Sequence, residues 1–448
     1  MTETLKSPIG NPAFRTLFLA QICSLLAIGL MTVAMSLAAY RIGGAAAAGQ
    51  ILGFLLAVKM VAYVFLAPMA ETLLAGRPRK PVMVGLDLAR MLLLLPMAFA
   101  TETWQIAALA FLFFGVSSGF TPVFQSVIPD IFPDEGLYSR ALVWSRIAYT
   151  LESILSPVIA AVALQLISAQ FLFWLAALAF VGSVAALLAT RFPATPKANG
   201  KGPFMKRALK GLRIYRKTPR LRGLFLLNLA LSLSMAWVLV NSVVLAGNWL
   251  GDSEYYYPKL MAFYGLGAAL GAIFVPRLIA ALGERRVMLA GALIHAALGP
   301  LIALPLGLAG YFALWSCLGI AASLVLTPGG LVIARSAVSA DRAALFAAQF
   351  SLSHAGWMLA YPLAGQLAAR AGLAPALIML SVLTVLVAAI AARVWPAGDP
   401  AALEHDHPEL PEDHPHLRDA PASGLRHRHS HTYHIDDLHT EWPGAQRA

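Results

Sequence analysis

Long uncharged apolar runs alternate with short polar breaks from Phe14 to Trp395. Each run is long enough to cross a bilayer as a helix, which takes roughly 20 apolar residues. The pattern therefore predicts an all-α membrane protein with twelve transmembrane helices. The predicted spans are residues 14–40, 50–74, 81–100, 104–128, 139–167, 171–190, 221–245, 257–281, 286–305, 311–334, 343–370 and 373–394.

The composition agrees with this prediction. Of the 448 residues, 59% are hydrophobic and 12% are charged, whereas soluble domains average about 25% charged residues. The formal net charge of +11 is concentrated in residues 191–222, where every charged side chain is basic. A basic block between two apolar spans is typical of a cytoplasmic loop beside anionic headgroups, so we exclude nucleic acid as a partner.

The basic loops also predict the orientation. Residues 77–80, after the second span, and residues 285–286, after the eighth, lie on the same side as the central basic block. Because cytoplasmic loops carry the excess of Lys and Arg, we expect both termini to be cytoplasmic. The expected location is the bacterial inner membrane, as a multi-pass protein.

The chain contains a weak internal repeat. Three pairs match at nearly the same separation. They are Thr121-Pro122 with Thr327-Pro328, Ser156-Pro157 with Tyr361-Pro362, and Pro68 with Pro276. We therefore predict two six-helix halves, 1–190 and 221–395, joined by a basic linker, 191–220, and followed by a His-rich tail, 396–448.

Three stretches carry a resemblance to a known family. "NPAFRTLFLAQ", "IPDIFPDEGLYSRALVWSRIAYTLESILSPVIAA" and the closing span resemble the major facilitator superfamily, in particular bacterial efflux proteins of the nickel/cobalt-resistance and enterobactin-exporter types. The resemblance covers roughly residues 11 to 395. It implies two pseudo-symmetric halves, alternating access, and a central cavity lined by spans one, five, seven and eleven. The loop "PMAETLLAGRPRKP" keeps the family's basic cluster but has Glu71 and Ala75 where the family has its glycine and acid.

Few ionisable side chains lie inside the predicted spans. A charge near the bilayer centre costs about 2.5–3.5 kcal/mol, so such residues usually face the bundle interior and mark transport paths. Asp87 and Arg90 share one helix face, and a structural ion pair is the alternative interpretation. Arg146 is long enough to reach the interface by snorkelling. The candidates for transport or coupling are Lys59, Asp87, Arg90, Arg146, Glu152 and His354.

Glu152 is the leading coupling candidate. It lies deep in the fifth span with no basic residue three or four positions away. A carboxyl group there can exchange a proton or bind a cation, although a plain hydrogen-bonding role stays open. His354 occupies nearly the corresponding region of span eleven and is either a second ligand or a strut, while Lys59 can pair with Glu152 or Asp87. The resemblance adds cavity-lining polar residues: Gln21, Asn228, Asn241 and Gln349.

The composition changes abruptly after Trp395, and we expect a disordered tail. It holds nine of the eleven histidines, mostly in H-x-H units: His405, His407, His414, His416, His427, His429, His431, His434 and His439. Imidazole suits ions such as nickel and zinc. We therefore expect an adaptable site for Ni, Co or Zn, and require no other cofactor. A solvated linker, a pH-responsive tail or an expression tag are the alternatives.

The sequence contains no nucleotide-binding motif and no catalytic constellation, so we do not expect an enzyme. The leading hypothesis is a monomeric secondary transporter that exports a divalent transition metal, nickel or cobalt first, coupled to protons. A second hypothesis keeps the fold but exports a siderophore or drug, with Trp237 and Trp357 available for stacking. A third is a membrane metal sensor that transports nothing.

Overall fold

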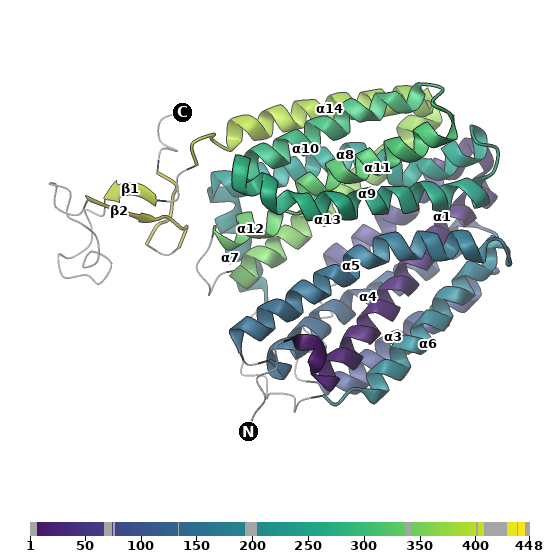
Figure 1. The fold of residues 1–448 in the computed structure, drawn as a ribbon, viewed down its shortest axis with the longest axis horizontal. Helices are drawn as coiled ribbons and strands as arrows, with labels where there is room; N and C mark the ends of the chain where they lie inside the picture. Colours follow the sequence, from purple (N-terminus) through teal and green to yellow (C-terminus); the bar gives the residue numbers. More distant parts are fainter. Residues whose placement is uncertain are drawn as a thin grey trace.

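The computed structural model describes residues 7–66, 74, 77–132, 134–192, 204–336, 342–399, 402–406, 428–436 and 438–443. Long helices fill the bundle and form two groups that lie side by side (Figure 1). The N-terminal half contains α1 (Pro12–Val61), α3 (Arg79–Met97), α4 (Thr103–Ile131), α5 (Glu135–Ala163) and α6 (Leu172–Ala189). The C-terminal half contains α8 (Pro219–Asn248), α9 (Ser253–Leu282), α10 (Glu284–Leu298), α11 (Gly307–Leu326), α12 (Gly329–Ala334), α13 (Arg342–Ala371) and α14 (Leu373–Val394). Helix α7 (Phe204–Lys217) links the halves, and the short elements are η1 (Pro8–Gly10), η2 (Ala62–Leu66), η3 (Ala169–Phe171) and η4 (Gly299–Ala303).

Helix α1 contains the first predicted span and the first part of the second, which continues into η2. The sequence predicts a loop over residues 41–49, but the chain stays helical and changes direction at Gly44, whose φ is 55° and ψ is −160°. Glycine reaches this region without a Cβ clash, so a single residue replaces the expected loop. The helix begins at Asn11, whose side chain accepts hydrogen bonds from the Ala13 and Phe14 amides.

Nine helical stretches among the described residues are long and apolar enough to cross a membrane. Helices α3, α5 and α13 cover the three remaining predicted spans. In lipid, a helix satisfies its backbone polar groups internally, which explains why apolar segments of this length fold as helices. The protein is therefore a multi-pass helical membrane protein.

The halves are joined near one end of the bundle. We call the end that carries residues 77–80, helix α7 and Arg285 the basic end. Helix α8 starts beside α7 and runs away from the basic end, so Asn248 marks the opposite end. Three side-chain hydrogen bonds between the halves lie toward that opposite end: Tyr40 to Asn248 (3.1 Å), Gln50 to Gln366 (3.0 Å) and Tyr257 to Ser36 (2.9 Å).

Part of the tail is folded, which corrects the predicted disorder. Strand β1 (Ala402–Asp406) pairs antiparallel with β2 (Arg428–Thr432), and both lie beyond the bundle on the side of α7 and α12 (Figure 1). The segment after β2 buries Tyr433 and Ile435, 5% and 3% exposed, in the main hydrophobic core. The many polar and charged residues of the tail predict disorder, but the segment also contains these apolar residues. The free energy gained by burying them offsets the entropy lost when the segment is ordered. His407, His414, His416 and His427 lie outside the described residues.

Helices α9 and α11 approach each other backbone to backbone. A Cβ at Gly267 would collide with the Ser316 carbonyl group, and one at Gly319 would collide with the Tyr264 carbonyl group. Two small residues facing opposite backbones in this way are typical of close packing between membrane helices.

We expect Gly267→Ala to destabilise the protein by about 1–3 kcal/mol, because the added methyl group forces the two helices apart. Thermal unfolding in detergent measures the effect. The matched control is Gly85→Ala in α3, where a Cβ would meet no atom within 4 Å. Equal shifts in the two variants would contradict the close α9–α11 contact.

Candidate functional site

Opposite charges meet near the boundary between the halves. Glu152 on α5 and Lys59 near the end of α1 are both half-buried and attract each other electrostatically. The Ser156 hydroxyl donates to the Glu152 carbonyl oxygen at 2.8 Å and lies 3.4 Å from Glu152 Oε1. Gly29 on α1 makes room, because a Cβ there would collide with Glu152 and Ser156. Of the two partners that the sequence allows for Lys59, Glu152 is the one with which it interacts electrostatically.

Lys59 also connects this pair to His354 in the C-terminal half. Its Nζ lies 5.0 Å from the Phe114 ring centroid and 5.9 Å from that of Tyr63. The Tyr63 ring meets the His354 ring edge to face at 5.5 Å, and His354 lies within the electrostatic reach of Lys59. His354 Nδ1 lies 2.7 Å from the Phe350 carbonyl oxygen, so this nitrogen donates and Nε2 carries the lone pair. Glu152, Lys59 and His354 therefore form one cluster that spans both halves.

Asp87 and Arg90 form a separate, enclosed pair in α3. Both side chains are buried and contact each other directly. The Ser183 hydroxyl on α6 donates to Asp87 Oδ2 at 2.5 Å. The guanidinium lies over the Phe120 and Phe180 rings, 4.4 and 4.7 Å from their centroids. This packing inside the N-terminal half favours the structural interpretation of the pair over a transport role.

We expect Asp87→Ala to lower the free energy of unfolding by about 3–5 kcal/mol, because it leaves the buried Arg90 charge without its partner. Exchanging the pair together for apolar residues, Asp87→Leu with Arg90→Met, should recover most of the loss. Unfolding in detergent measures stability, and substrate transport is measured on the same samples. A double variant that is stable but does not transport would contradict a structural role.

The other predicted site residues whose side chains the structure describes form hydrogen bonds within the protein. Gln21 donates to the Ser145 hydroxyl on α5 at 2.6 Å, and Asn241 donates to the Ala364 carbonyl oxygen at 3.3 Å. Gln349 accepts from Tyr215 of α7, and Asn228 donates to the Leu224 carbonyl oxygen of its own helix at 2.9 Å. The Arg146 backbone lies in α5, and its side chain lies outside the described residues. The bonds of Gln21, Asn241 and Gln349 thus join different helices.

The predicted stacking tryptophans also pack within the protein. Trp237 is fully buried and donates its indole N–H to the Leu373 carbonyl oxygen at 3.0 Å. Trp357 stacks on Tyr361 with ring centroids 5.1 Å apart. Trp237 is therefore not available to a flat ligand in this conformation.

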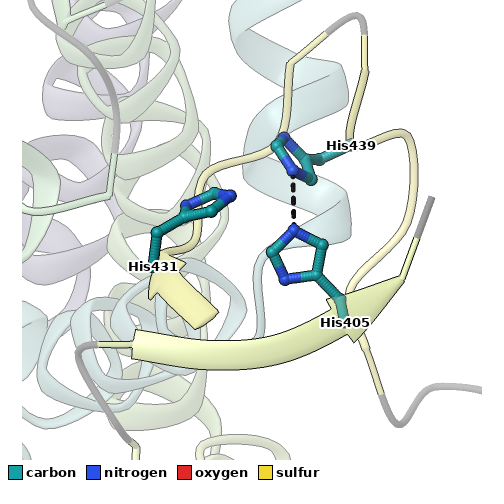
Figure 2. Close-up of side chains that lie close together, drawn as sticks. All are labelled: His405, His431 and His439. Atoms are coloured by element: carbon teal, nitrogen blue, oxygen red, sulfur yellow. Dashed lines mark hydrogen bonds between the residues drawn. The ribbon is translucent and has the colours of Figure 1, made fainter. Parts of the chain in front are cut away.

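Three tail histidines converge on one point. His405 comes from β1, His431 from β2 and His439 from the segment after β2, and Figure 2 shows their rings turned toward one another. One ligating atom from each lies within 4.8 Å of the others, and the Nε2 atoms of His405 and His439 are 3.1 Å apart. We call His405, His431 and His439 the imidazole triad. The triad has the nitrogen donors that zinc, copper and nickel prefer.

The opposite ring nitrogen of each triad histidine faces an acceptor. Nδ1 lies 2.9 Å from the Leu403 carbonyl oxygen in His405 and 2.8 Å from the Thr432 carbonyl oxygen in His431. In His439 it lies 2.9 Å from Asp436 Oδ1. Because carbonyl and carboxylate oxygens only accept, the Nδ1 atoms carry the protons, and the Nε2 atoms of His405 and His439 face each other at 3.1 Å. Metal-bound histidines are commonly held by such partners.

Burial keeps the third imidazole neutral. The pKa of His439 lies below its usual value because the ring is buried, and the nearby Asp436 opposes this shift only in part. Burial alone would raise the pKa of Asp436, but hydrogen bonds from His439 and Leu438 hold it below its usual value. A neutral imidazole fixed by an ionised carboxylate is the state that binds a metal ion.

The sequence indicated metal-binding histidines but not which of them meet. His434 lies outside the triad, and burial lowers its pKa. His429 is the register partner of His405, and its side chain lies outside the described residues.

Two further residues of these sites were not expected from the sequence, Tyr63 and Phe114 around Lys59. The sequence places Asp436 among the acids that can add oxygen ligands near the tail histidines, and in the structure its carboxylate faces His439 Nδ1. The two aromatic residues look like any other apolar position of a membrane helix, so their role depends on the packing of the helices.

Two helical halves are joined at one end of this membrane protein, and half-buried charges lie near their boundary. The sequence profile of the Major Facilitator Superfamily matches residues 17–256, more than half of the chain. The chain therefore belongs to the Major Facilitator Superfamily, and it is a transporter. No curated protein sequence matches it.

Solved transporters share this fold at low sequence identity. The nucleoside transporter NupG matches with a TM-score of 0.68 and 12% identity, over 85% of this chain and 98% of that one. A POT family transporter in complex with 5-aminolevulinic acid matches with a TM-score of 0.68 and 13% identity, over 89% of this chain and 98% of that one. A bacterial homolog of the human lysosomal transporter Spinster, inward-facing and unoccupied, matches with a TM-score of 0.64 and 16% identity, over 86% of this chain and 95% of that one. At these identities the likeness concerns the fold alone.

Proposed function

We propose that this transporter exports a divalent transition metal ion, nickel or cobalt first, in exchange for protons. The observation that carries the proposal is the imidazole triad at the basic end of the bundle, in which one ligating nitrogen from each histidine lies within 4.8 Å of the others. Imidazole is a preferred ligand of borderline ions of this kind. The tail thus collects the ion where the transporter takes it up.

The proposed topology has twelve spans with both termini in the cytoplasm of a bacterium. It rests on the basic loops, which are typical of the cytoplasmic side of the inner membrane. The hydrogen bonds between the halves then lie toward the outer end, so the conformation is inward-facing. Alternating access would rock the halves about the cluster of Glu152, Lys59 and His354 in a monomer.

The central cluster supplies a physical basis for coupling. The Lys59 ammonium attracts the ionised Glu152 carboxylate. It would repel the metal cation that is to be exported. A metal ion entering the cluster therefore needs the ionised carboxylate, while a proton on Glu152 removes that attraction. Metal and proton cannot use the carboxylate together, which is the requirement for exchange. His354 contributes a nitrogen from the other half.

We expect Glu152→Gln to abolish metal tolerance in an expressing strain, because the amide can neither ionise nor release a proton. Folding should persist, since the amide keeps the size of the side chain and its contact with Ser156. The measurement is growth in nickel, cobalt and zinc together with the amount of folded protein in the membrane. Glu102→Gln, at an exposed position in the same half, is the matched control. Wild-type tolerance in Glu152→Gln would exclude Glu152 as the coupling group.

A second candidate function is export of an organic cation or siderophore. It is favoured by the aromatic rings of Tyr63, Phe114 and Phe350 around the central cluster. The structural neighbours named for nucleosides and 5-aminolevulinic acid indicate that this fold accepts organic molecules. In this case the tail regulates transport and is not part of the substrate's path.

Truncation of the tail distinguishes these functions and a non-transporting sensor. The cut belongs after Pro400, because Asp399 forms ion pairs with Arg220 and Arg335 that should be kept. A metal exporter should need a higher internal metal concentration for half-maximal export and so lose tolerance. An organic exporter should keep its activity without the tail, and a sensor should lose its metal response without ever moving metal. Growth against a panel of metals and toxic organic compounds, with and without the tail, measures the outcome.

A further inference from the structure

We propose that the imidazole triad is a metal-dependent clasp. An ion bound by His405, His431 and His439 fixes the segment 433–443 against the basic end of the C-terminal half. This inference rests on the metal site of the proposed function, but it does not require that the metal be exported. The ions it suits are the borderline divalent cations that prefer imidazole, such as nickel and zinc.

The three ligands belong to three segments of the tail. His405 and His431 lie on paired strands, so backbone hydrogen bonds already hold them near each other. His439 lies outside the strand pair, seven residues after the end of β2. Its Nε2 nevertheless reaches to within 3.1 Å of the His405 Nε2. A bound ion would therefore add a link between the strands and the segment after them.

The distance between these two nitrogens fits a shared ion. With metal–nitrogen bonds of about 2.0–2.1 Å, neighbouring ligands of a tetrahedral ion lie roughly 3.3–3.4 Å apart, a little more than the 3.1 Å between these two nitrogens. Both Nε2 atoms carry lone pairs because both Nδ1 protons face acceptors, so this contact needs a positive charge between the rings. A proton could bridge only the two Nε2 atoms of His405 and His439. A metal ion could also bind a ring nitrogen of His431.

The segment 433–443 rests on a buried guanidinium. Arg220, at the start of α8, is 2% exposed and donates to the Tyr433 carbonyl oxygen at 3.4 Å. Its guanidinium lies 5.1 Å from the Trp442 ring centroid. Asp399 is 3.6 Å from Arg220 and 2.7 Å from Arg335, and Glu284 is 3.6 Å from Arg335, so two carboxylates face two guanidinium groups. Tyr433 and Trp442 complete the surroundings of the buried Arg220 guanidinium.

A second contact ties the segment to the linker between the halves. Lys217, the last residue of α7, donates from Nζ to the Thr440 carbonyl oxygen at 2.6 Å. The Tyr433 hydroxyl donates to the Glu441 carbonyl oxygen at 2.5 Å and closes the segment on itself. The docked segment therefore touches both α7 and α8, through which the two halves of the transporter are connected.

Ion binding and docking must strengthen each other. Docking holds His439 beside the strands, and the ion holds His439 in the docked position. An ion that binds the docked state more tightly than the undocked state stabilises docking. By the same amount of free energy, docking increases the affinity of the triad for the ion. The tail thus reports the cytoplasmic metal concentration to the linker by docking when the ion is present.

Hydrogen exchange of the full-length protein in detergent, with and without Zn²⁺ or Ni²⁺, tests the clasp. We expect metal to slow amide exchange in residues 433–443 and to leave the interior of α8 unchanged. His439→Ala should lose this protection. Trp442→Ala should weaken zinc binding, measured by calorimetry, by about tenfold, a typical coupling between linked sites.

A variant of matched composition separates geometry from histidine content. Substituting His407, His414, His416 and His427 by alanine removes four tail histidines but leaves the triad intact, so the protection should persist. The clasp is wrong if this variant loses protection as fully as His439→Ala, or if metal binds the wild type without slowing exchange in 433–443. Absent metal export with intact protection would contradict the proposed function and leave the clasp standing. Metal export without metal-dependent protection of residues 433–443 would contradict the clasp and leave the proposed function standing.

Discussion

A charge inside a bilayer persists only where the protein replaces the hydration it has lost, and this constraint organises the molecule. The N-terminal half answers it in two ways. Asp87 and Arg90 are closed off completely, with a serine hydroxyl and two aromatic rings around them. Glu152 and Lys59 stay half-buried and interact electrostatically near the other half. The first pair holds helices together, and the second is the proposed coupling site.

Much of the fold follows from the sequence, because the bilayer leaves few alternatives. Apolar runs must become helices, and described helices overlap the predicted spans, nine of them long and apolar enough to cross a membrane. The turn at Gly44 could not be predicted, since glycine is equally common where membrane helices pack closely. The partner of Lys59 was also undetermined, because Asp87 and Glu152 lie on different helices and the choice depends on their packing.

The tail shows where composition misleads. Its histidines and acids are typical of disorder, yet Tyr433, Ile435 and Trp442 are enough to pack part of it onto the bundle. Once that segment is docked, the backbone decides which imidazoles meet. Three histidines from three segments form the triad, and no H-x-H spacing in the sequence identifies them. The imidazole triad, a buried arginine and the linker helix thereby become one connected structure at the basic end.

The measurement that tests the account most directly is metal flux in proteoliposomes of the purified protein. A pH gradient is imposed, and a metal-sensitive dye in the lumen reports entry of nickel, cobalt or zinc. The account predicts metal movement opposite to the proton gradient that stops when a protonophore collapses it. Movement of an organic cation under the same gradient, with no flux of any of the three metals, would contradict it.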